Sequence, residues 1–227
     1  MTTAADRARR VLDVAVAGTL LVLGAPLLAA TALLVRATSP GPALFVQERV
    51  GKDGRVFGLR KLRTMVADAP VRGGALTTPG DPRVTRVGAV LRRWKLDELP
   101  QLLNVLGGDM SLVGPRPEVP RYVAGYGPRQ REVLRVRPGI TDPASLAFVD
   151  EAAVLARYDD CERAYVETVL PAKLALSLAY LERRTLASDL GVLARTLVRI
   201  ARGGRAEPDP IDSVAAAVRR ARGAARV

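Results

Sequence analysis

Histidine is missing from this sequence of 227 residues, and cysteine occurs once, at Cys161. Without histidine the chain cannot form a Ser-His-Asp triad, a Cys-His pair or a zinc site with imidazole ligands. A single cysteine excludes a disulfide within the chain. If the chain is an enzyme, its chemistry must therefore come from carboxylates, lysine, arginine, tyrosine or hydroxyl side chains, or from an oxygen-bound cation such as Mg²⁺.

Aromatic residues are also scarce, at 4%, whereas 35 Lys+Arg face 23 Asp+Glu for a net charge of +12. Residues 49–137 hold 18 Lys+Arg and 8 Asp+Glu, so +10 of that charge lies in one segment. The low aromatic content and the lack of a recognisable nucleic-acid motif argue against DNA or RNA as a partner. Because this basic segment follows a long apolar run, we expect it to attract lipid head groups and ligands that carry phosphate.

The apolar run covers residues 14–35, which are 22 consecutive residues without a charge. This length is typical of a membrane-embedded segment. The run is too long for a signal peptide, and no small-residue cleavage site follows it. Basic residues lie on both sides, at Arg7, Arg9 and Arg10 before the run and at Arg36 after it. We therefore expect both ends to stay on the cytoplasmic side.

Pro26, preceded by Gly24 and Ala25, lies near the middle of the run and divides it into pieces of 12 and 10 residues. A proline inside a helix removes one hydrogen bond and kinks the chain. Each piece would be roughly 15 to 18 Å long, about half of a hydrocarbon core. The sequence favours a re-entrant helix-break-helix hairpin with its break at Pro26, and a kinked single-pass anchor is the alternative.

A small β-hairpin is predicted after the membrane segment. Residues 43–47 and 55–59 favour strands, and Lys52-Asp53-Gly54 between them carries the Asp-Gly pair of a tight turn. Residues 66–82 form a long loop by their glycine, proline and threonine content. We expect residues 66–80 to become ordered over a bound substrate.

The rest of the chain favours helices. They are predicted over residues 84–106, 121–136 and 151–202, with breaks at Arg137-Pro138-Gly139 and near Pro171. The fold class is therefore α+β and mainly helical. We predict a membrane segment at 1–38, a catalytic domain at 39–202 and a flexible, arginine-rich tail at 203–227, with a short helix at 211–222.

The densest group of chemically useful residues surrounds the adjacent carboxylates Asp97 and Glu98, which have Arg92 and Lys95 close by. Neighbouring residues on a helix point about 100° apart, so the two carboxylates would take different roles. One could attack a phosphorus atom while the other holds a metal, with the basic side chains stabilising the transferring phosphoryl group. The alternative is a solvated Asp-Glu pair at a helix start.

A series of short motifs runs through residues 8–200. In chain order they are Arg10-Val11-Leu12-Asp13, Ser39-Pro40-Gly41-Pro42, Gln47-Glu48-Arg49-Val50-Gly51, Lys61-Leu62-Arg63-Thr64-Met65, Asp81-Pro82-Arg83-Val84-Thr85, Leu96-Asp97-Glu98-Leu99-Pro100-Gln101-Leu102, Asn104-Val105-Leu106, residues 108–117 with Gly114-Pro115-Arg116-Pro117, and Val136-Arg137-Pro138-Gly139-Ile140-Thr141. In order and spacing this series resembles that of the bacterial sugar transferases in their small monotopic form, the polyprenyl-phosphate phosphoglycosyl transferases.

The resemblance implies transfer of a sugar 1-phosphate from a nucleoside diphosphate sugar, usually a UDP-sugar, to polyprenyl phosphate. The products would be polyprenyl diphosphate sugar and UMP, and the reaction starts a surface glycan. Asp97 would be the nucleophile of a phosphosugar-aspartyl intermediate. Glu98, with Asp97 beside it, would bind Mg²⁺, which offsets the charge of the diphosphate.

The resemblance also implies phosphate contacts by Arg92 and Arg116, since a planar guanidinium suits phosphate oxygens. Lys61 and Arg63 are further candidates for the phosphates, and attraction to lipid phosphates is their alternative role. Two departures from the family pattern stand out. Ala25 replaces the serine that precedes the proline of the break, and residues 142–150 differ from the stretch that family members carry. We expect that stretch to lie near the donor.

The resemblance places the protein at the bacterial inner membrane as a monotopic enzyme, with interfacial amphipathic helices and an active site on the cytoplasmic face. Its partners would be a nucleotide-sugar donor, the polyprenyl phosphate acceptor and membrane lipid, with no nucleic acid. The sugar, the polyprenol length and the oligomeric state stay open, and a homodimer is one alternative. A non-catalytic membrane-surface adaptor that retains the fold is the competing function, and it predicts lipid binding without turnover.

Overall fold

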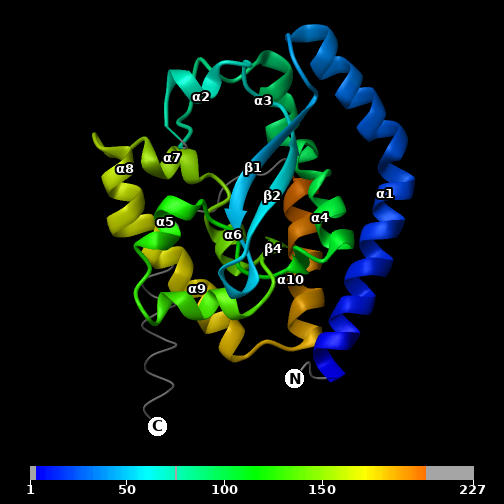
Figure 1. Ribbon diagram of the computed structural model, residues 1–227, viewed down its shortest axis with the longest axis vertical. Coiled ribbons are helices and arrows are strands. Elements are labelled where there is room, and N and C mark those ends of the chain that lie inside the picture. The colour runs from blue at the N-terminus through cyan, green and yellow to red at the C-terminus, as the bar shows by residue number, and fades with distance from the viewer. Residues whose placement is uncertain (1–3, 75, 203–227) are drawn as a thin grey trace.

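The computed structural model describes residues 4–74 and 76–202, so the predicted tail and its helix at 211–222 lie outside the described residues (Figure 1). The helices are α1 (Ala4–Thr38), α2 (Ala69–Arg72), α3 (Arg86–Arg93), α4 (Gln101–Gly107), α5 (Pro120–Ala124), α6 (Pro143–Ala147), α7 (Glu151–Leu155), α8 (Cys161–Ala164), α9 (Leu170–Glu182) and α10 (Leu186–Ala201). The strands are β1 (Leu44–Val50), β2 (Val56–Leu62), β3 (Ser111–Val113) and β4 (Gly139–Thr141). Shorter helical turns are η1 (Lys52–Gly54), η2 (Leu96–Glu98), η3 (Gln130–Arg135) and η4 (Tyr165–Val169). The predicted mainly helical fold with a small β-hairpin is confirmed.

Helix α1 is the one element in the described part of the chain that is long and apolar enough to cross a membrane. Only 11% of its most apolar window is buried, which is far too little for a core helix. The expected hairpin with a break at Pro26 is not confirmed, because α1 continues through this proline. Thr31, in the following turn, donates its hydroxyl to the carbonyls of Leu27 and Leu28 at 2.8 and 3.0 Å.

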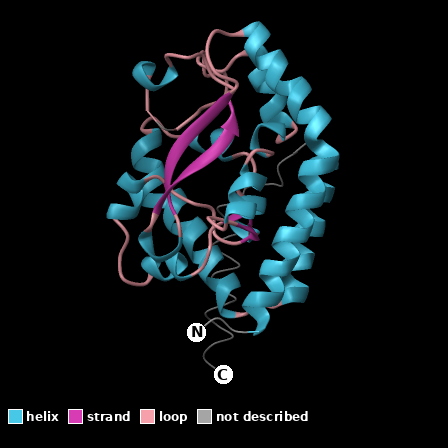
Figure 2. Ribbon diagram, turned by 45° about the vertical axis from the view of Figure 1, so that its right-hand side comes forward, coloured by secondary structure: helices cyan, strands magenta, loops and turns pink. Residues whose placement is uncertain are grey.

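The N-terminal end of α1 is fastened to the rest of the protein by polar contacts. Arg10 donates to the carbonyls of Val105 and Leu106 at 2.6 and 2.9 Å, at the end of α4. The Asp13 carboxylate accepts hydrogen bonds from the Leu112 N–H at 2.9 Å and from the Ser111 hydroxyl. Along its length α1 packs mainly against α4 and follows one side of the molecule (Figures 1 and 2).

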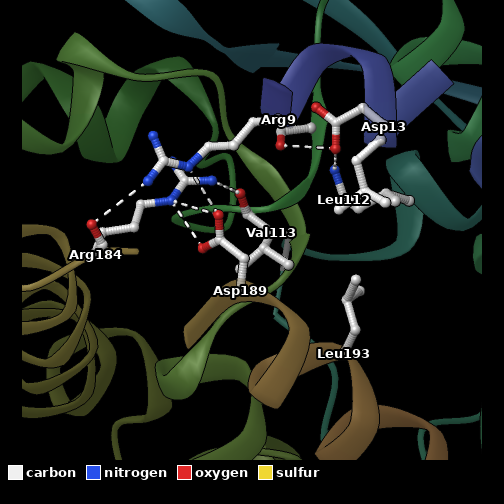
Figure 3. Close-up of a pocket in the computed structure, with 9 residues that line it drawn as sticks. Arg9, Asp13, Leu112, Val113, Arg184, Asp189 and Leu193 are labelled. Atoms are coloured by element: carbon white, nitrogen blue, oxygen red, sulfur yellow. Dashed lines mark hydrogen bonds and ion pairs between the residues drawn. The ribbon is translucent and has the colours of Figure 1, made fainter. Parts of the chain in front are cut away.

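A small hollow lies at this junction (Figure 3). Its centre is the buried Asp189 carboxylate of α10, which accepts from the Arg9 Nε and the Arg184 Nε, both at 2.9 Å. Arg184 also donates to the Val113 carbonyl at 2.8 Å. The hollow has a volume of about 10 Å³, which is at most room for a single water molecule. These residues therefore join α1, β3 and α10 and do not form a substrate site.

The hairpin predicted from the Asp-Gly turn is present. β1 and β2 pair antiparallel from Leu44 opposite Leu62 to Val50 opposite Val56. Asp53 and Gly54 have positive φ angles of 55° and 78°, which the turn requires. Residues directly opposite each other in an antiparallel pair share a face, so Phe45 and Lys61 extend to the same side.

The predicted helix over residues 84–106 is wrong as a single element. α3 begins with Thr85 as N-cap, whose hydroxyl accepts from the Gly88 N–H at 2.9 Å, and it ends at Arg93. Lys95 then takes a left-handed conformation with φ 56°, and η2 and Pro100 separate α3 from α4. The turn places Asp97 and Glu98 between two helices, so neither carboxylate lies on a regular helix face.

Strands β3 and β4 pair in parallel, which the sequence did not predict. Gly114 and Gly139 make this pairing possible, because a Cβ on Gly139 would lie 2.1 Å from the Gly114 nitrogen. The expected break at residues 137–139 is the start of β4. The expected break near Pro171 is wrong: α8, η4 and α9 follow one another directly, and the chain turns instead between α9 and α10. Pro171 lies just after the π-helical turn η4, and a wider turn of this kind lets a helix continue past a residue that breaks its regular hydrogen bonding.

The core lies in three clusters of buried side chains. The largest joins α5, η3, α7 and the α8–α9 segment, with Val133, Leu155 and Val169 among its members. The second fixes α4 and β3 against α1 and α10. The third contains Val35, Leu62 and Leu91 and fixes α3 and β2 against the end of α1. The hairpin and η2 are thus held between separate parts of the core.

Candidate active site

A cavity of about 500 Å³ lies beside the hairpin, bordered by β1, β2, the segment from Thr64 to Thr77, α3 and η2. Six of the side chains that line it are basic and two are acidic: Arg49, Lys61, Arg63, Arg83, Arg92 and Lys95 against Asp97 and Glu98. Apolar side chains, including Phe45, Leu62 and Met65, line other parts of it. A net charge of +4 in a partly enclosed space suits a polyanion, because low-dielectric walls strengthen the field of the basic groups.

Asp97 is buried, with 7% of its surface exposed. Its Oδ1 atom is enclosed and has no hydrogen-bond partner within the described residues. Burial raises the pKa of Asp97, and the neighbouring charge of Glu98 raises it further, against the lowering effect of Lys61, Lys95 and Arg92. The chain therefore presents, at the edge of a basic cavity, a carboxylate with one oxygen free of competing bonds.

Glu98, the next residue, is in the opposite situation. Arg116 donates to both of its carboxylate oxygens, from Nη2 to Oε1 at 2.7 Å and from Nη1 to Oε2 at 3.1 Å. Burial alone would raise the pKa of Glu98, but Arg116, followed by Lys95 and Lys61, holds it well below its usual range. In turn, Glu98 raises the pKa of Arg116. Two adjacent carboxyl groups with pKa values displaced in opposite directions can take separate chemical roles.

Lys61 and Arg92, two of the residues predicted to contact phosphate, both line this cavity. Lys61, on β2, has its pKa lowered to about 8 because burial disfavours its charge and Arg116 adds repulsion. Arg92, at the end of α3, donates from Nε to the Thr64 hydroxyl at 2.8 Å. Its two terminal amino groups have no partner among the residues that the structure describes, so they can contact a ligand in the cavity.

Arg63 is different, although it also borders the cavity. Its guanidinium is buried and is surrounded by the turn at residues 39–42. It donates to the Ser39 hydroxyl and the Ser39 carbonyl, both at 2.8 Å, to the Pro42 carbonyl at 2.7 Å, to Gly41 and to Pro40. Every nitrogen of the guanidinium is therefore engaged, and Arg63 fixes the chain where it leaves α1.

Arg83 and Arg49 are cavity residues that sequence reasoning did not select as site residues. Arg83 pairs with Asp81 at 2.7 Å and donates to the carbonyls of Gly74 and Leu76, both at 2.8 Å, so it shapes the loop before α3. Arg49, on β1, is bound by Gln47 and Glu118. Both arginines belong to motifs that carry the resemblance, and that membership was the signal available in the sequence.

The bacterial sugar transferase family model matches residues 4–203, which is most of the chain. The chain belongs to the bacterial sugar transferase family. The predicted family is confirmed, and with it the enzyme class, a sugar transferase of the phosphoglycosyl type that the names of its relatives describe.

Three relatives illustrate the similarity of this sugar transferase to known proteins. It is 42% identical over 199 residues to the UDP-glucose:undecaprenyl-phosphate glucose-1-phosphate transferase of Caulobacter vibrioides, a match that covers 86% of this chain and 70% of that one. It is 45% identical over 162 residues to the UDP-N-acetylgalactosamine-undecaprenyl-phosphate N-acetylgalactosaminephosphotransferase of Aeromonas hydrophila, covering 66% of this chain and 38% of that protein. An exopolysaccharide production protein of Rhizobium leguminosarum is 43% identical over 145 residues, 61% of this chain and 72% of its own length.

The segment in which this sugar transferase departs from the family pattern, residues 142–150, does not line the cavity. Asp142 is fully buried and caps α6: its Oδ1 accepts from the N–H and the hydroxyl of Ser145, at 2.7 and 2.6 Å. Its Oδ2 accepts from the Ser177 hydroxyl on α9 at 2.6 Å. In this structure the start of the segment thus fastens α6 to α9, and our expectation that it lies near the donor is not supported by the cavity.

Two carboxylates that line the cavity, Asp97 and Glu98, are candidate donors for a magnesium ion. No cluster of three or more acidic, histidine or cysteine side chains occurs among the residues of the sugar transferase that the structure describes. Mg²⁺ commonly binds through one or two carboxylates and completes its coordination with water and substrate phosphates. Asp97, with its unpartnered Oδ1, and Glu98 fit such a site, although Glu98 would have to share its oxygens with Arg116.

Proposed function

We propose that this chain transfers a sugar 1-phosphate from a UDP-sugar to polyprenyl phosphate, with release of UMP, by way of a covalent phosphosugar-aspartyl intermediate at Asp97. The observation that carries the proposal is the Asp97 carboxylate, which is buried beside a cavity of net charge +4 and leaves one oxygen unpartnered. The names of the relatives, which act on undecaprenyl phosphate and UDP-sugars, support the substrate classes.

In the first step, an Asp97 oxygen attacks the β-phosphorus of the donor. The new bond joins aspartate and phosphorus, and the bond from the β-phosphorus to the bridging oxygen breaks, so that UMP leaves with that oxygen. Lys61, Arg92 and Lys95 lie around Asp97 and can bind the diphosphate. Their positive charge favours the transition state, in which charge moves onto the phosphate oxygens.

In the second step, an oxygen of polyprenyl phosphate attacks the same phosphorus. The bond between phosphorus and the aspartate oxygen breaks, polyprenyl diphosphate sugar forms, and Asp97 returns to its carboxylate state. Neither step needs a proton acceptor, because both attacking groups are already anionic. This agrees with a chain that has no histidine.

Glu98 and Asp97 are the residues that would hold Mg²⁺. When bound, the ion would supply charge neutralisation to the diphosphate. The ion pair between Glu98 and Arg116 keeps Glu98 ionised. Arg116 does not itself line the cavity, so it would act on the site through Glu98.

We also propose a monotopic arrangement, with α1 embedded from the cytoplasmic face and both of its ends on that face. The first turns of α1 bind α4, β3 and α10 through Arg10, Asp13 and Arg9. Ser39, the residue that follows α1, accepts hydrogen bonds from Arg63, the residue that follows β2. A straight crossing would place the membrane between these two sets of contacts, which supports an embedded helix whose two ends lie on the same face.

Exposed apolar side chains support the interfacial helices of this arrangement. Val90 and Trp94 are exposed at the end of α3, and Leu197 and Val198 are exposed on α10. Such side chains favour the boundary between head groups and acyl chains. The name of the Rhizobium relative, an exopolysaccharide production protein, supports a role in starting a surface glycan.

The competing function is a membrane-surface adaptor without catalysis. An adaptor needs a basic surface and an anchor, but it has no need of a buried Asp-Glu pair whose members have opposite pKa displacements. Burial of ionised groups is costly unless they are paired, so this arrangement costs stability that a surface adaptor would have no reason to give up. The geometry therefore favours the transferase.

The experiment that tests the function measures UMP release by the detergent-solubilised full chain with undecaprenyl phosphate, Mg²⁺ and a panel of UDP-sugars. Asp97→Asn should abolish both UMP release and the covalent sugar-phosphate adduct detected by mass spectrometry of the intact protein. Asp53→Asn is the matched control, since Asp53 lies in the hairpin turn at a positive φ that asparagine tolerates. Lipid binding without UMP release from any donor would favour the adaptor.

A further inference from the structure

Two charged side chains of the Gly114-Pro115-Arg116-Pro117-Glu118 stretch bind two charged residues of the cavity wall. Arg116 pairs with Glu98 of η2, and Glu118, two residues further, pairs with Arg49 of β1 at 3.5 Å. The backbone reinforces the second contact, because the Val50 N–H donates to the Glu118 carbonyl at 2.9 Å. Residues 114–118 thus hold both Glu98, the neighbour of the proposed nucleophile Asp97, and Arg49 of the hairpin.

Glu118 is itself fixed from behind. It is 7% exposed, and its Oε1 accepts from the Tyr165 hydroxyl at 2.5 Å and lies 3.7 Å from the Lys173 Nζ. Lys173 is also buried and donates to Glu151 at 2.6 Å. The other oxygen of Glu118, Oε2, is the one nearest to Arg49. Buried charges of this kind are stable only when each has its partners, so the network sets the position of Glu118.

The guanidinium of Arg49 is held on two sides and still borders the cavity. The Gln47 amide oxygen accepts from Nε at 3.2 Å and from Nη2 at 2.8 Å, while Nη1 donates to the Pro117 carbonyl at 3.0 Å. A guanidinium has five N–H donors in a fixed plane, so one N–H of Nη2 is still available. Arg49, Gln47 and Phe45 alternate along β1 on the face that also carries Lys61.

We propose that Arg49 binds a substrate phosphate and that Glu118, held by Lys173 and Tyr165, is the positioning residue that orients its guanidinium. The proposal rests on the proposed function, to which it adds a binding residue on the hairpin. The ligand chemistry is a phosphate oxygen, which either the donor diphosphate or the acceptor monophosphate can supply. Burial lowers the pKa of Arg49, Glu118 offsets part of that effect, and Arg116 adds a smaller lowering through charge repulsion. A bound anion beside the two arginines would relieve that repulsion.

The test is equilibrium binding of two probes, UDP and farnesyl phosphate, to the full chain in detergent. UDP represents the donor, and farnesyl phosphate represents the acceptor. Arg49→Lys should weaken the binding of one probe by about tenfold, because a lysine cannot reproduce the oriented, charge-assisted hydrogen bonds of the guanidinium. The matched control is Arg60→Lys, on the adjacent strand, where Arg60 is exposed and does not border the cavity. It should leave both dissociation constants within about twofold, the usual effect of an isolated surface charge.

Positioning is tested by the pair of residues together. Glu118→Gln keeps a hydrogen-bond acceptor for Tyr165 but loses the charge that orients Arg49, so it should weaken binding of the same probe. Residues that act as a unit give non-additive effects. The double variant Arg49→Lys with Glu118→Gln should therefore bind the probe no more weakly than whichever single variant binds it less tightly. If Glu118→Gln does not fold, Lys173→Met, which removes the cation behind Glu118, replaces it in this comparison of single and double variants.

Equal dissociation constants for Arg49→Lys and Arg60→Lys with both probes would overturn the role of Arg49. If the fold-changes in the dissociation constant caused by Arg49→Lys and Glu118→Gln multiply in the double variant, the positioning role of Glu118 would be overturned. Because binding is measured without turnover, these outcomes stay separate from the proposed function, which fails only if UMP is not released from any UDP-sugar or if its release survives Asp97→Asn.

Discussion

The guanidinium of Arg116 binds both oxygens of the Glu98 carboxylate, at 2.7 and 3.1 Å. This pairing keeps Glu98 ionised under conditions in which most carboxyl groups begin to take up protons. The fixed negative charge of Glu98 then adds to the effect of burial on Asp97 and raises the pKa of that neighbour. The consequences can be measured in both the activity and the stability of the protein.

The rate of the covalent step should have a bell-shaped dependence on pH. Only ionised Asp97 can attack, and its pKa is raised, so the rate should fall on the acid side at a pH above the usual value of about 4 for an aspartate. Lys61, with a pKa of about 8, should lose its charge on the alkaline side, and the rate should fall there too. Rapid-quench measurement of the first turnover across the pH range would give both limbs.

Variants of Lys61 provide the control for this pH profile. Lys61→Arg should remove the alkaline limb, since arginine stays charged, and Lys61→Met should move the acid limb to higher pH, since a cation that lowers the pKa of Asp97 is gone. An alkaline limb that is unchanged in Lys61→Arg would contradict the assignment.

Asp97→Asn should stabilise the protein at neutral pH. The pKa of Asp97 is raised in the folded state, so the folded protein holds the proton of this carboxyl group more tightly than the unfolded chain does. Asp97 therefore destabilises the fold most at a pH where its carboxyl group is ionised in both the folded and the unfolded state. The gain from asparagine should therefore be largest above the folded-state pKa and should vanish as the pH falls below the unfolded-state value. Thermal unfolding at a series of pH values, with Asp53→Asn as the surface control, would reveal the difference.

Arg63→Ala should destabilise the protein by roughly 2 to 4 kcal/mol, because it removes a buried guanidinium that donates to the turn at residues 39–42, including the buried Ser39. Arg55, at the end of the hairpin turn, is exposed, so Arg55→Ala should have almost no effect on the free energy of unfolding. Chemical denaturation of both variants would measure the difference. If Arg63→Lys instead raises the KM for the donor while the denaturation midpoint stays unchanged, the original prediction of a phosphate-binding role is the better one.

The two ends of α1 should react alike in a topology experiment. The experiment uses two variants, Ala5→Cys and Ala37→Cys, each in a chain that also carries Cys161→Ser. Both positions are exposed, and they lie near opposite ends of α1. A membrane-impermeant maleimide added to intact spheroplasts should label neither cysteine, and it should label both after permeabilisation. Labelling of one cysteine in intact spheroplasts would identify α1 as a crossing helix instead.

The loop before α3 should become protected from protease when the donor binds. Val66, Ala67 and Thr77 of this loop border the cavity, and Arg72, which lies between them in the chain, is exposed. We expect UDP-sugar with Mg²⁺ to slow tryptic cleavage after Arg72, with cleavage after the exposed Arg183, between α9 and α10, as the internal reference. Unchanged cleavage at both arginines would exclude ordering of this loop over the donor.

The sequence was sufficient to predict much of the local structure. The Asp-Gly turn determined the hairpin, since few other residues tolerate the positive φ angles at positions 53 and 54. The 22 uncharged residues determined an apolar helix that the protein cannot bury, and the ordered motifs determined the family. Local patterns were insufficient at Pro26 and Pro171, where a proline within a helical run does not by itself end the helix.

The tertiary structure alone decided which charged residues share the cavity. Lys61, Arg63, Arg92 and Arg116 were all candidates for phosphate contacts on the sequence, with Lys61 and Arg63 as the weaker pair. Folding directs Arg63 into the turn after α1 and Arg116 onto Glu98, while the two terminal amino groups of Arg92 have no partner within residues 4–74 and 76–202. The sequence by itself thus determined the family, the hairpin and the pair of carboxylates, because these depend on residue types and short spacings. The different states of Asp97 and Glu98 depend on burial and on a cation 18 residues away in the chain, which only the folded protein brings to within 2.7 Å.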